Sequence, residues 1–326
     1  MTATDTAIAD RHGLTLPPAT TLPGQSQLDD ASAATRYTGT YINLDRSADR
    51  RAQIDAEIAT FGLQHLYRRF PAADGNVLAY PNPHLSEGEI GCFSSHLLLL
   101  RQNLAAEAHV HVVEDDAMFS QFTAQMIKFV VASGTIDQYD IVFTDSTVTP
   151  SRSDYEQYRA LYDACVERDA AGNVTRVHPT VVDYYVGATT SYIVNRRSIP
   201  KLVGLFTREL TNGATMPIDL FIRKAAREGA LRVGSLFPFA TSLRIENVLN
   251  NTIAGRRNNL LSRIAVCLGR ISFFVECGHR ALHQCTMQLF PDAARPPALP
   301  LQGSDAHRAI LKDILGFCAS DKFVQY

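Results

Sequence analysis

Hydrophobic residues along residues 37–255 follow two alternating patterns, one with the period of a β-strand and one with the period of an α-helix. Runs rich in β-branched and aromatic residues predict strands, and apolar residues three and four positions apart predict helices. Strands are expected at residues 37–44, 65–70, 109–113, 139–144, 182–187, 189–195 and 231–237. Helices are expected to begin at Ser47, Ser86, Ser120, Ser198 and Pro217. Strands that alternate with helices in this way predict an α/β fold.

The clearest single element is the helix that begins at Ser86. Ser86 and Glu89 occupy the N-cap and N3 positions of a capping box. A core-facing stripe follows at spacings of three and four residues, formed by Ile90, Phe93, Leu97, Leu100 and Leu104. Glu89, Cys92 and His96 lie along one flank of the helix. His96 is expected either to contact a substrate or to be a hydrogen-bonded structural histidine beside the core.

The strand at residues 109–113 runs directly into three consecutive carboxylates, Glu114, Asp115 and Asp116. The carboxyl end of a strand is where an α/β sheet opens its ligand crevice. Carboxylates this close repel one another, so they either turn into water or share a cation, and oxygen ligands favour Mg²⁺ or Mn²⁺. The sequence therefore predicts either a divalent-metal site or residues that only end the strand and cap the next helix.

Charged residues also follow three other predicted elements. Between the first strand and the first helix, Arg46 and Arg50 could bind a phosphate-bearing ligand together with the free N–H groups of the helix. The alternative for these arginines is a solvated, charged first turn. Asp145 follows the strand at residues 139–144. Asp219 lies at the start of the helix begun by Pro217, where a carboxylate also complements the helix dipole.

Composition narrows the class of protein. The chain has 326 residues, 46% of them hydrophobic, which suffices for a full core in one large domain or two modest ones. A net charge of −2 gives no support for binding to nucleic acid. Six cysteines without a C-x-x-C pair, no recognisable signal peptide and no long uncharged apolar run together predict a cytoplasmic protein without a spanning helix.

The two ends of the chain differ from its middle. Residues 1–36 lack a hydrophobic period and are expected to form a disordered or loosely attached leader. Residues 256–326 are expected to form a helical extension, with a proline-rich linker at residues 291–300 and a last helix from Ser304.

Within this extension, residues 256–290 combine apolar residues with five arginines, which are Arg256, Arg257, Arg263, Arg270 and Arg280. A basic amphipathic pattern of this kind predicts peripheral contact with the anionic inner face of a membrane. The alternative is a pair of helices packed on the central domain or on a second subunit of a homo-oligomer.

Three segments together resemble glycosyltransferase family 25, which includes bacterial lipopolysaccharide and lipooligosaccharide galactosyltransferases and the collagen galactosyltransferases. Residues 41–51, YINLDRSADRR, resemble the family's nucleotide-side motif. Residues 85–96, LSEGEIGCFSSH, resemble its most distinctive signature, and residues 113–116, VEDD, match its acidic metal motif at the expected distance downstream. The order and spacing of the three motifs carry the resemblance, which covers about residues 37–255.

The resemblance implies a GT-A fold over residues 37–255, in which a Rossmann-like mixed sheet is flanked by helices. It also implies an inverting, metal-dependent transfer of a sugar, usually galactose, from a UDP-sugar to a glycan or lipid-linked glycan acceptor, as in lipopolysaccharide or other surface-glycan biosynthesis. Asp116 and Glu114 would hold Mn²⁺ or Mg²⁺. The residues expected to contact the nucleotide sugar are Asn43, Leu44, Arg46, Arg50, Glu89, His96, Glu114 and Asp115.

Inversion requires a base that deprotonates the acceptor hydroxyl on the face opposite the leaving group. Asp219 is the first candidate for this base and Asp145 is the second. Residues 146–182, which carry Tyr155, Tyr158 and Tyr162, are expected to form an insertion on the acceptor side or a flexible lid.

Two other classes of protein are compatible with the fold. One is a catalytically silent family member that acts as a binding or adhesion module, and the intact carboxylates argue against it. The other is a phosphotransfer enzyme that uses the same carboxylates, but the sequence has no P-loop or kinase signature.

Overall fold

The computed structural model describes residues 37–78, 82–148, 152–244, 260–289, 305–320 and 323. Several predicted features lie outside these described residues: the leader over residues 1–36, the linker over residues 291–300, and both Arg256 and Arg257. The side chains of Arg263 and Arg280 also lie outside the described part of the structure.

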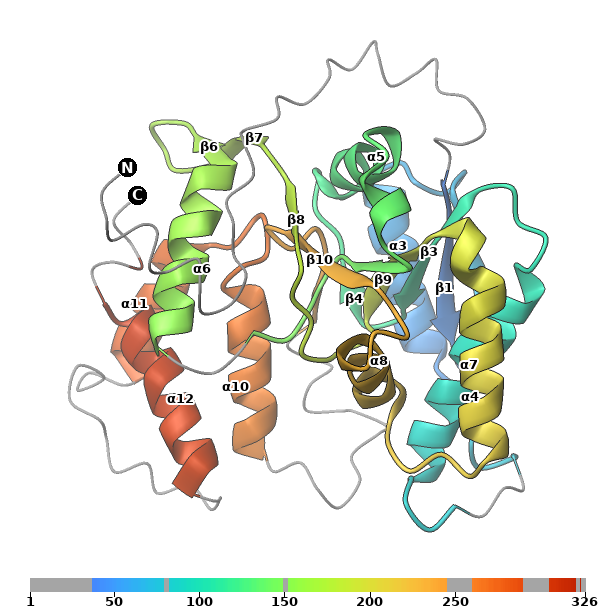
Figure 1. Cartoon of the computed structure of the whole chain (residues 1–326). Helices are drawn as coiled ribbons and strands as arrows, with labels where there is room; N and C mark the ends of the chain where they lie inside the picture. The colour runs from blue at the N-terminus through green and yellow to red at the C-terminus, as the bar shows by residue number, and fades with distance from the viewer. Residues whose placement is uncertain are drawn as a thin grey trace.

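A seven-stranded sheet forms the centre of the molecule, with the strand order β2-β1-β3-β9-β5-β10-β8 (Figure 1). Its strands are β1 (Tyr37–Asn43), β2 (Tyr67–Pro71), β3 (His109–Glu114), β5 (Ile141–Phe143), β8 (Thr180–Val182), β9 (Ser191–Val194) and β10 (Val233–Phe237). β1 runs parallel to β2 and β3, and β5 runs parallel to β10. β9 is antiparallel to both β3 and β5, and β8 is antiparallel to β10. The predicted mixed α/β sheet is therefore confirmed.

The strand predicted at residues 182–187 is wrong. β8 ends at Val182, whose carbonyl accepts a hydrogen bond from the Tyr184 backbone N–H, and this turn ends the ladder with β10. The following residues lead without regular structure to β9. The apolar residues that predicted a strand here, among them Tyr185, instead pack against the sheet from a loop.

Two groups of helices cover the faces of the sheet. On one face, α4 (Glu87–Gln102), α7 (Ile199–Thr211) and α8 (Ile218–Arg227) share a core with alternate residues of the central strands, such as Val110 and Val112. On the other face, α3 (Ala48–Thr60) and α5 (Thr123–Ala132) pack over Val113 and its neighbours. Successive side chains of a strand point to opposite faces, so β3 contributes to both cores.

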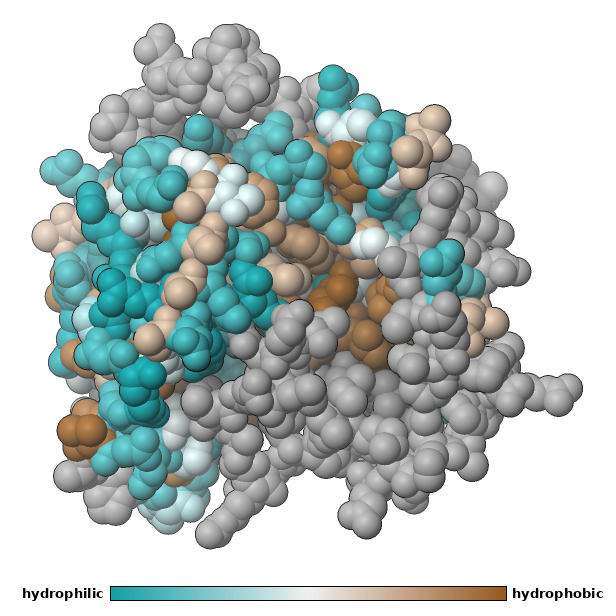
Figure 2. All heavy atoms as spheres, turned by 180° about the vertical axis from the view of Figure 1, so that it is seen from behind, coloured by the Kyte–Doolittle hydropathy of each residue, from teal (hydrophilic) through white to brown (hydrophobic). Residues whose placement is uncertain are grey.

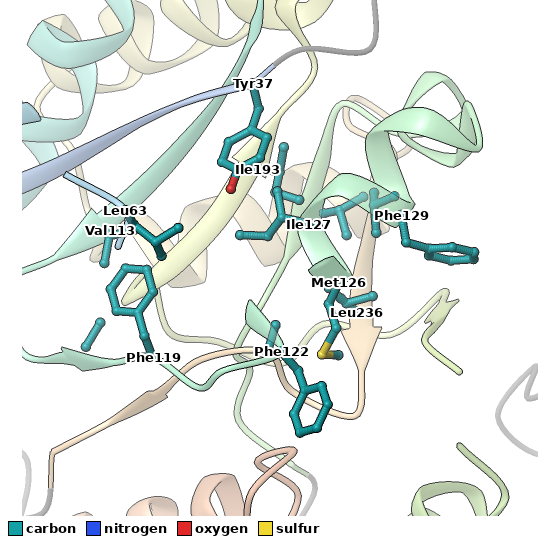
Figure 3. Packing of buried hydrophobic residues seen from close by; sticks show 14 of the residues in the cluster. Tyr37, Leu63, Val113, Phe119, Phe122, Met126, Ile127, Phe129, Ile193 and Leu236 are labelled. Atoms are coloured by element: carbon teal, nitrogen blue, oxygen red, sulfur yellow. The ribbon is translucent and has the colours of Figure 1, made fainter. Parts of the chain in front are cut away.

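Figure 3 shows how the second of these cores is packed. Met126 and Ile127 of α5 lie beside Ile193 of β9 and Leu236 of β10, and all four side chains are fully buried. The spacing of Phe122, Met126, Phe129 and Val130 places them on the same side of the helix, as the hydrophobic period predicts. This packing holds α5 against β9 and β10.

Short elements complete the described part of the chain. They are the two-stranded pairs β4 (Ala117–Met118) with β11 (Ser242–Leu243) and β6 (Val166–Arg168) with β7 (Val174–Val177), and the 3-10 helices Thr135–Gln138 and Arg196–Ser198. β4 and β11 matter most for the site, because they pair directly after the acidic cluster.

The expectation of a flexible lid over residues 146–182 is wrong for the described residues. The segment contains a helix, α6 (Arg152–Cys165), and the strands β6, β7 and β8, and its three tyrosines are buried. Tyr155, Tyr158 and Tyr162 are spaced three and four residues apart, so they form one face of the helix. Some of their aromatic partners, such as Phe273 beside Tyr155, come from more than 100 residues further along the chain.

The helical extension packs on this same aromatic face. It consists of α10 (Leu260–Ile271), α11 (His279–Leu289) and α12 (Asp305–Cys318), which lie beside α6 in Figure 1. Ile314, Leu315 and Phe317 of α12, the last helix predicted from the sequence, are buried there. Of the two interpretations of residues 256–290, packing on the central domain is therefore the one that the described residues show.

No helix within the described residues has both the length and the apolar character needed to cross a membrane. From behind, the described surface is hydrophilic over much of its area, with hydrophobic residues gathered near the middle of the view (Figure 2).

The capping box predicted for Ser86 is present. The Ser86 hydroxyl accepts a hydrogen bond from the Glu89 backbone N–H at 3.3 Å, and the Glu89 carboxylate accepts one from the Ser86 backbone N–H at 2.7 Å. Ser47 occupies the N-cap position of α3, but its side chain makes no capping hydrogen bond. The two serines are therefore a matched pair for measuring the cap.

We expect Ser86→Ala to lower the free energy of unfolding by about 0.5–2 kcal/mol, because the backbone N–H of Glu89 in the first turn of α4 loses its hydrogen-bond acceptor. Ser47→Ala is expected to change it by less than about 0.5 kcal/mol. Urea unfolding of both variants measures the difference. An equal effect of the two substitutions would show that the box does not stabilise α4.

Candidate functional site

A cleft of about 260 Å³ opens at the carboxyl ends of β1 and β3. The turn after β1, the loop after β2, the first turns of α4 and the acidic cluster form its walls. Predicted residues that line it are Leu44, Arg46, Arg50, His96, Glu114, Asp115 and Asp116. The three segments that carry the sequence motifs, which are far apart in the chain, therefore meet in one cavity.

Two glycines allow one wall of the cleft to close against α4. A Cβ atom on Gly91 would lie 2.8 Å from the backbone nitrogen of Gly75, and one on Gly75 would lie 1.7 Å from the carbonyl oxygen of Glu87. Neither position therefore has room for a side chain without moving backbone. This close approach brings the loop after β2 against the first turns of α4, and it explains why residue 91 of the helical signature is a glycine.

Asp115 connects the turn after β1 to the end of β3. Its carboxylate accepts a hydrogen bond of 2.7 Å from the Asn43 side chain and lies 3.0 Å from the Arg50 guanidinium. Burial raises the pKa of Asp115, and the attraction of Arg50 opposes the rise. Asn43, Arg50 and Asp115 thus lie together as the motifs predict, with both Asp115 oxygens already engaged.

Glu114 is held by neighbours from two other elements. One carboxylate oxygen accepts a hydrogen bond of 2.7 Å from the Thr189 hydroxyl and lies 3.3 Å from Nε2 of His96. Nδ1 of His96 lies 2.7 Å from the Tyr192 hydroxyl, so a proton on Nε2 lets both contacts form. Burial alone would raise the pKa of Glu114, but the contacts with His96 and Thr189 outweigh it and lower the pKa.

His96 is accordingly a buried, hydrogen-bonded histidine that also lines the cleft. Of the two alternatives raised by the sequence, the structure shows the hydrogen-bonded histidine, and contact with a substrate stays a prediction. Tyr192, its partner on β9, was not predicted, because nothing in the local sequence of β9 indicates a contact with α4.

Asp116 differs from the other two carboxylates. Its Oδ1 atom is buried and has no hydrogen-bond partner among the described residues. Burial and the repulsion of Glu114 and Asp115 raise the pKa of Asp116 to about 7. A buried carboxylate oxygen without a partner costs free energy, and a divalent cation is a partner that offsets both the burial and the repulsion. The residues present therefore fit the divalent metal that the resemblance implies.

A second group in the cleft also has metal-ligand chemistry. One ligand atom each from Cys92, His96 and Glu114 lies within 4.8 Å of the others. A thiol and an imidazole suit a softer cation such as Zn²⁺, whereas carboxylates alone suit Mg²⁺ or Mn²⁺. Glu114 belongs to both groups, so the structure places it where either cation would use it.

Asp145, the second candidate base, is fully buried in an ion pair with Arg270. Its other oxygen lies 2.9 Å from Nε of the same guanidinium, which also donates a hydrogen bond of 2.7 Å to Thr190. A carboxylate enclosed in this way cannot reach an acceptor hydroxyl without breaking the pair. Asp145 therefore positions Arg270 rather than facing the cleft.

Arg270 itself was interpreted from the sequence as part of a basic surface, and the described structure shows it buried. Its charge helps to lower the pKa of Glu114 and opposes the rise at Asp116. Asp145 and Arg270 are 125 positions apart, and no local pattern pairs them. Only the docking of α10 brings the arginine to the acidic cluster.

Asp219, the first candidate base, lies in the first turn of α8 and is partly exposed. Its carboxylate accepts hydrogen bonds from the backbone N–H groups of Ala188 at 3.3 Å and Leu220 at 2.8 Å. Burial raises the pKa of Asp219, and these two hydrogen bonds oppose the rise. It does not line the cleft of Asp116, although the charge of Glu114 reaches it.

Arg46 and Glu89 were also predicted to contact the nucleotide, and each is paired with another group of the chain. Arg46 lines the cleft and forms an ion pair with Asp74, with about half of its side chain exposed. Glu89 serves the capping box and does not line the cleft, whereas its neighbours Glu87 and Gly88 do. The prediction that Glu89 faces the donor pocket is therefore not supported by the described geometry.

The fold and the cleft define an α/β protein with an acidic site at the carboxyl ends of its central strands. The model of Glycosyltransferase family 25 (LPS biosynthesis protein) matches residues 39–222, which is more than half of the chain. The chain therefore belongs to this family of glycosyltransferases, and its mixed sheet is consistent with the GT-A fold. No curated protein matches the chain.

We expect Arg270→Met to lower the free energy of unfolding by about 3–5 kcal/mol, because Asp145 would remain buried without its partner. Arg197→Met is a matched control, since Arg197 and Asp137 form an ion pair that is mostly exposed, and it should cost less than about 1 kcal/mol. Urea unfolding measures both. Adding Asp145→Asn to Arg270→Met should recover part of the loss, and the absence of any recovery would contradict the pairing.

Asp116→Asn is expected to stabilise the metal-free protein at neutral and alkaline pH. The raised pKa means that the folded chain retains a proton that the unfolded chain releases, so this carboxyl reduces stability as pH rises from about 4 to about 7. Asparagine removes that cost. The increase in Tm over the wild type should therefore grow from pH 5 to pH 7 and be constant above pH 8, at roughly 2–4 °C for each kcal/mol relieved.

Differential scanning calorimetry across this pH range measures the effect. Asp137→Asn, at an exposed carboxylate, is the control and should show no comparable trend. Added Mn²⁺ should reverse the order by stabilising the wild type more than the variant. A variant that is less stable than metal-free wild type at pH 8 would contradict the assignment of an uncompensated charge to Asp116.

Proposed function

We propose that the chain is an inverting, metal-dependent glycosyltransferase that transfers galactose from UDP-galactose to a glycan acceptor in lipopolysaccharide or related surface-glycan biosynthesis. Family membership supports glycosyl transfer, and the family's description supports the biosynthetic setting. The observation that carries the proposal is the unpartnered carboxylate oxygen of Asp116 in a cleft that also contains arginines.

The donor would bind with its diphosphate at the acidic end of this cleft. Asp116 and Glu114 would hold Mn²⁺ or Mg²⁺, which when bound neutralises the charge on the departing diphosphate. Arg50 and Arg46 line the same wall and would orient the nucleotide, because guanidinium groups bind phosphate with defined geometry. Asp115 keeps Arg50 in place through their ion pair.

His96 would position Glu114 rather than take part in proton transfer. Its Nδ1 contact with Tyr192 fixes the ring, and its Nε2 contact fixes the Glu114 carboxylate. A fixed carboxylate loses less conformational freedom when it binds a ligand. This role explains why a buried histidine follows the glycines of the helical signature.

Asp219 would accept the proton of the acceptor hydroxyl. Two backbone N–H groups fix its orientation, and its raised pKa makes it a better proton acceptor than an ordinary aspartate. It lies in the first turn of α8 and does not line the cleft of Asp116, where the departing diphosphate would bind. The same carboxylate also complements the α8 dipole.

The direct test is the release of UDP from UDP-galactose by the purified chain with Mn²⁺, compared with UDP-glucose and with the N-acetylhexosamine donors. Asp116→Ala should lower turnover by at least about 100-fold, since one metal ligand is lost. Asp137→Ala, at an exposed site, should have no effect. Equal turnover by wild type and Asp116→Ala would contradict the metal site, and no release from any nucleotide sugar would favour the silent binding module.

Asp219→Asn separates the base from the donor site. We expect a loss of transfer to the acceptor by at least about 100-fold, with the affinity for UDP and Mn²⁺ unchanged. Transfer kinetics and titration calorimetry measure the two quantities. Full transfer activity in this variant would exclude Asp219 as the base.

A further inference from the structure

We propose that a second cleft, beside α8 and separate from the cleft of Asp116, binds a phosphate group carried by the acceptor glycan. The acceptor part of this inference rests on the proposed function, whereas the phosphate site itself does not. The cleft has a volume of about 550 Å³. It lies between α8, the start of β10 and the residues that follow β8.

Three arginines give this cleft its charge. Arg223 and Arg227 are one turn apart on α8, and Arg232 precedes β10. Asp183 is the acidic residue of the lining, and its carboxylate accepts a hydrogen bond of 2.6 Å from the Tyr139 hydroxyl. Among the described residues, no carboxylate forms an ion pair with any of the three guanidinium groups.

The described residues therefore leave the three guanidinium groups without an ion-paired carboxylate at the edge of a concave surface, although the charge of Asp219 acts on Arg223. Arg223 donates a hydrogen bond of 3.1 Å to the Val186 carbonyl, which fixes its position. Arg227 and Arg232 are exposed, and neither guanidinium forms a hydrogen bond or an ion pair with another described residue. Like charges at positions i and i+4 of a helix destabilise it, and an oxyanion with several acceptor oxygens would reverse that effect.

The position of the cleft assigns the phosphate to the acceptor. Asp219, Arg223 and Arg227 recur every four residues, so they lie along one side of α8. At a rise of about 1.5 Å per residue, Arg223 is about 6 Å and Arg227 about 12 Å from Asp219 along the helix axis. A glycan whose hydroxyl reaches Asp219 could therefore extend along α8 to these arginines.

Tyr185 forms the boundary between the two positions. Its ring stacks on Phe143 with a centroid distance of 3.8 Å, and its hydroxyl donates a hydrogen bond of 3.0 Å to the Ala188 carbonyl, whose backbone N–H in turn contacts Asp219. Tyr185 also lines the arginine cleft. Tyr185 thus contacts both Ala188, which holds the proposed base, and the proposed phosphate site. The diphosphate of the donor would have other arginines, Arg46 and Arg50, at the cleft of Asp116.

The binding test compares glucose 6-phosphate, inorganic phosphate and glucose by titration calorimetry at low salt. Glucose 6-phosphate should bind, glucose should not, and inorganic phosphate should compete with glucose 6-phosphate. The double variant Arg227→Ala/Arg232→Ala should weaken the binding at least tenfold, because it removes two of the three guanidinium groups. Both side chains are exposed, so the variant is expected to fold like the wild type. Arg208→Ala, at an exposed position on α7, is the matched control and should bind like the wild type.

Undiminished binding of glucose 6-phosphate by the double variant, or equal binding of glucose, would overturn the site. Binding of UDP with Mn²⁺ should be the same in all variants. If glucose 6-phosphate binds through the arginines but no UDP is released from any donor, the phosphate site stands and the proposed function fails.

The assignment to the acceptor is tested by transfer kinetics with lipopolysaccharide as the acceptor. The double variant should raise the KM for lipopolysaccharide at least tenfold and leave the KM for the UDP-sugar unchanged. Removing the phosphates of the lipopolysaccharide with phosphatase should have the same effect on the wild type and little further effect on the variant. A higher KM for the UDP-sugar instead would assign the cleft to the donor and overturn the inference.

Discussion

Three carboxylates crowded together at the end of one strand, Asp115 buried and Glu114 and Asp116 partly buried, are the constraint on which the rest of the site depends. Each would be costly to bury alone, and the chain compensates two of them with its own residues. Asp115 has Arg50, and Glu114 has His96. Asp116 has a buried oxygen without a partner among the described residues. The remaining cost is concentrated at one atom, where a cation can relieve it, so a bound cation would recover that free energy as affinity.

The compensation extends beyond the part of the chain that the family model matches. Arg270 lies on α10, outside residues 39–222, and its ion pair with Asp145 holds it near the acidic cluster. From there its charge helps to lower the pKa of Glu114 and opposes the rise in the pKa of Asp116. α10 is held in turn by the aromatic core that it shares with α6 and α12. The helical extension is thus part of the electrostatic environment of the acidic cleft, and its packing has a consequence for function.

The separation of two interacting residues along the chain decides whether the sequence predicts their contact. The capping box at Ser86, the apolar stripe of α4 from Ile90 to Leu100 and the acidic end of β3 are local patterns, and each was predicted correctly, whereas Leu104 lies beyond the end of α4 and is exposed. The three motifs also predicted that Arg50 and Asp115 would share a site. The Asp145–Arg270 pair and the burial of the α6 tyrosines depend on segments more than 100 residues apart, and a single sequence holds no local signal for such pairing.

The central claim is that a divalent cation binds the free oxygen of Asp116 together with the diphosphate of a nucleotide. Anomalous diffraction from a crystal grown with Mn²⁺ and UDP tests it most directly, because it locates manganese without assuming its ligands. The account predicts one strong anomalous peak within about 2.5 Å of an Asp116 carboxylate oxygen and a phosphate oxygen of UDP. A peak at Cys92 and His96 without Asp116, or UDP bound with Asp116 still unligated, would contradict it.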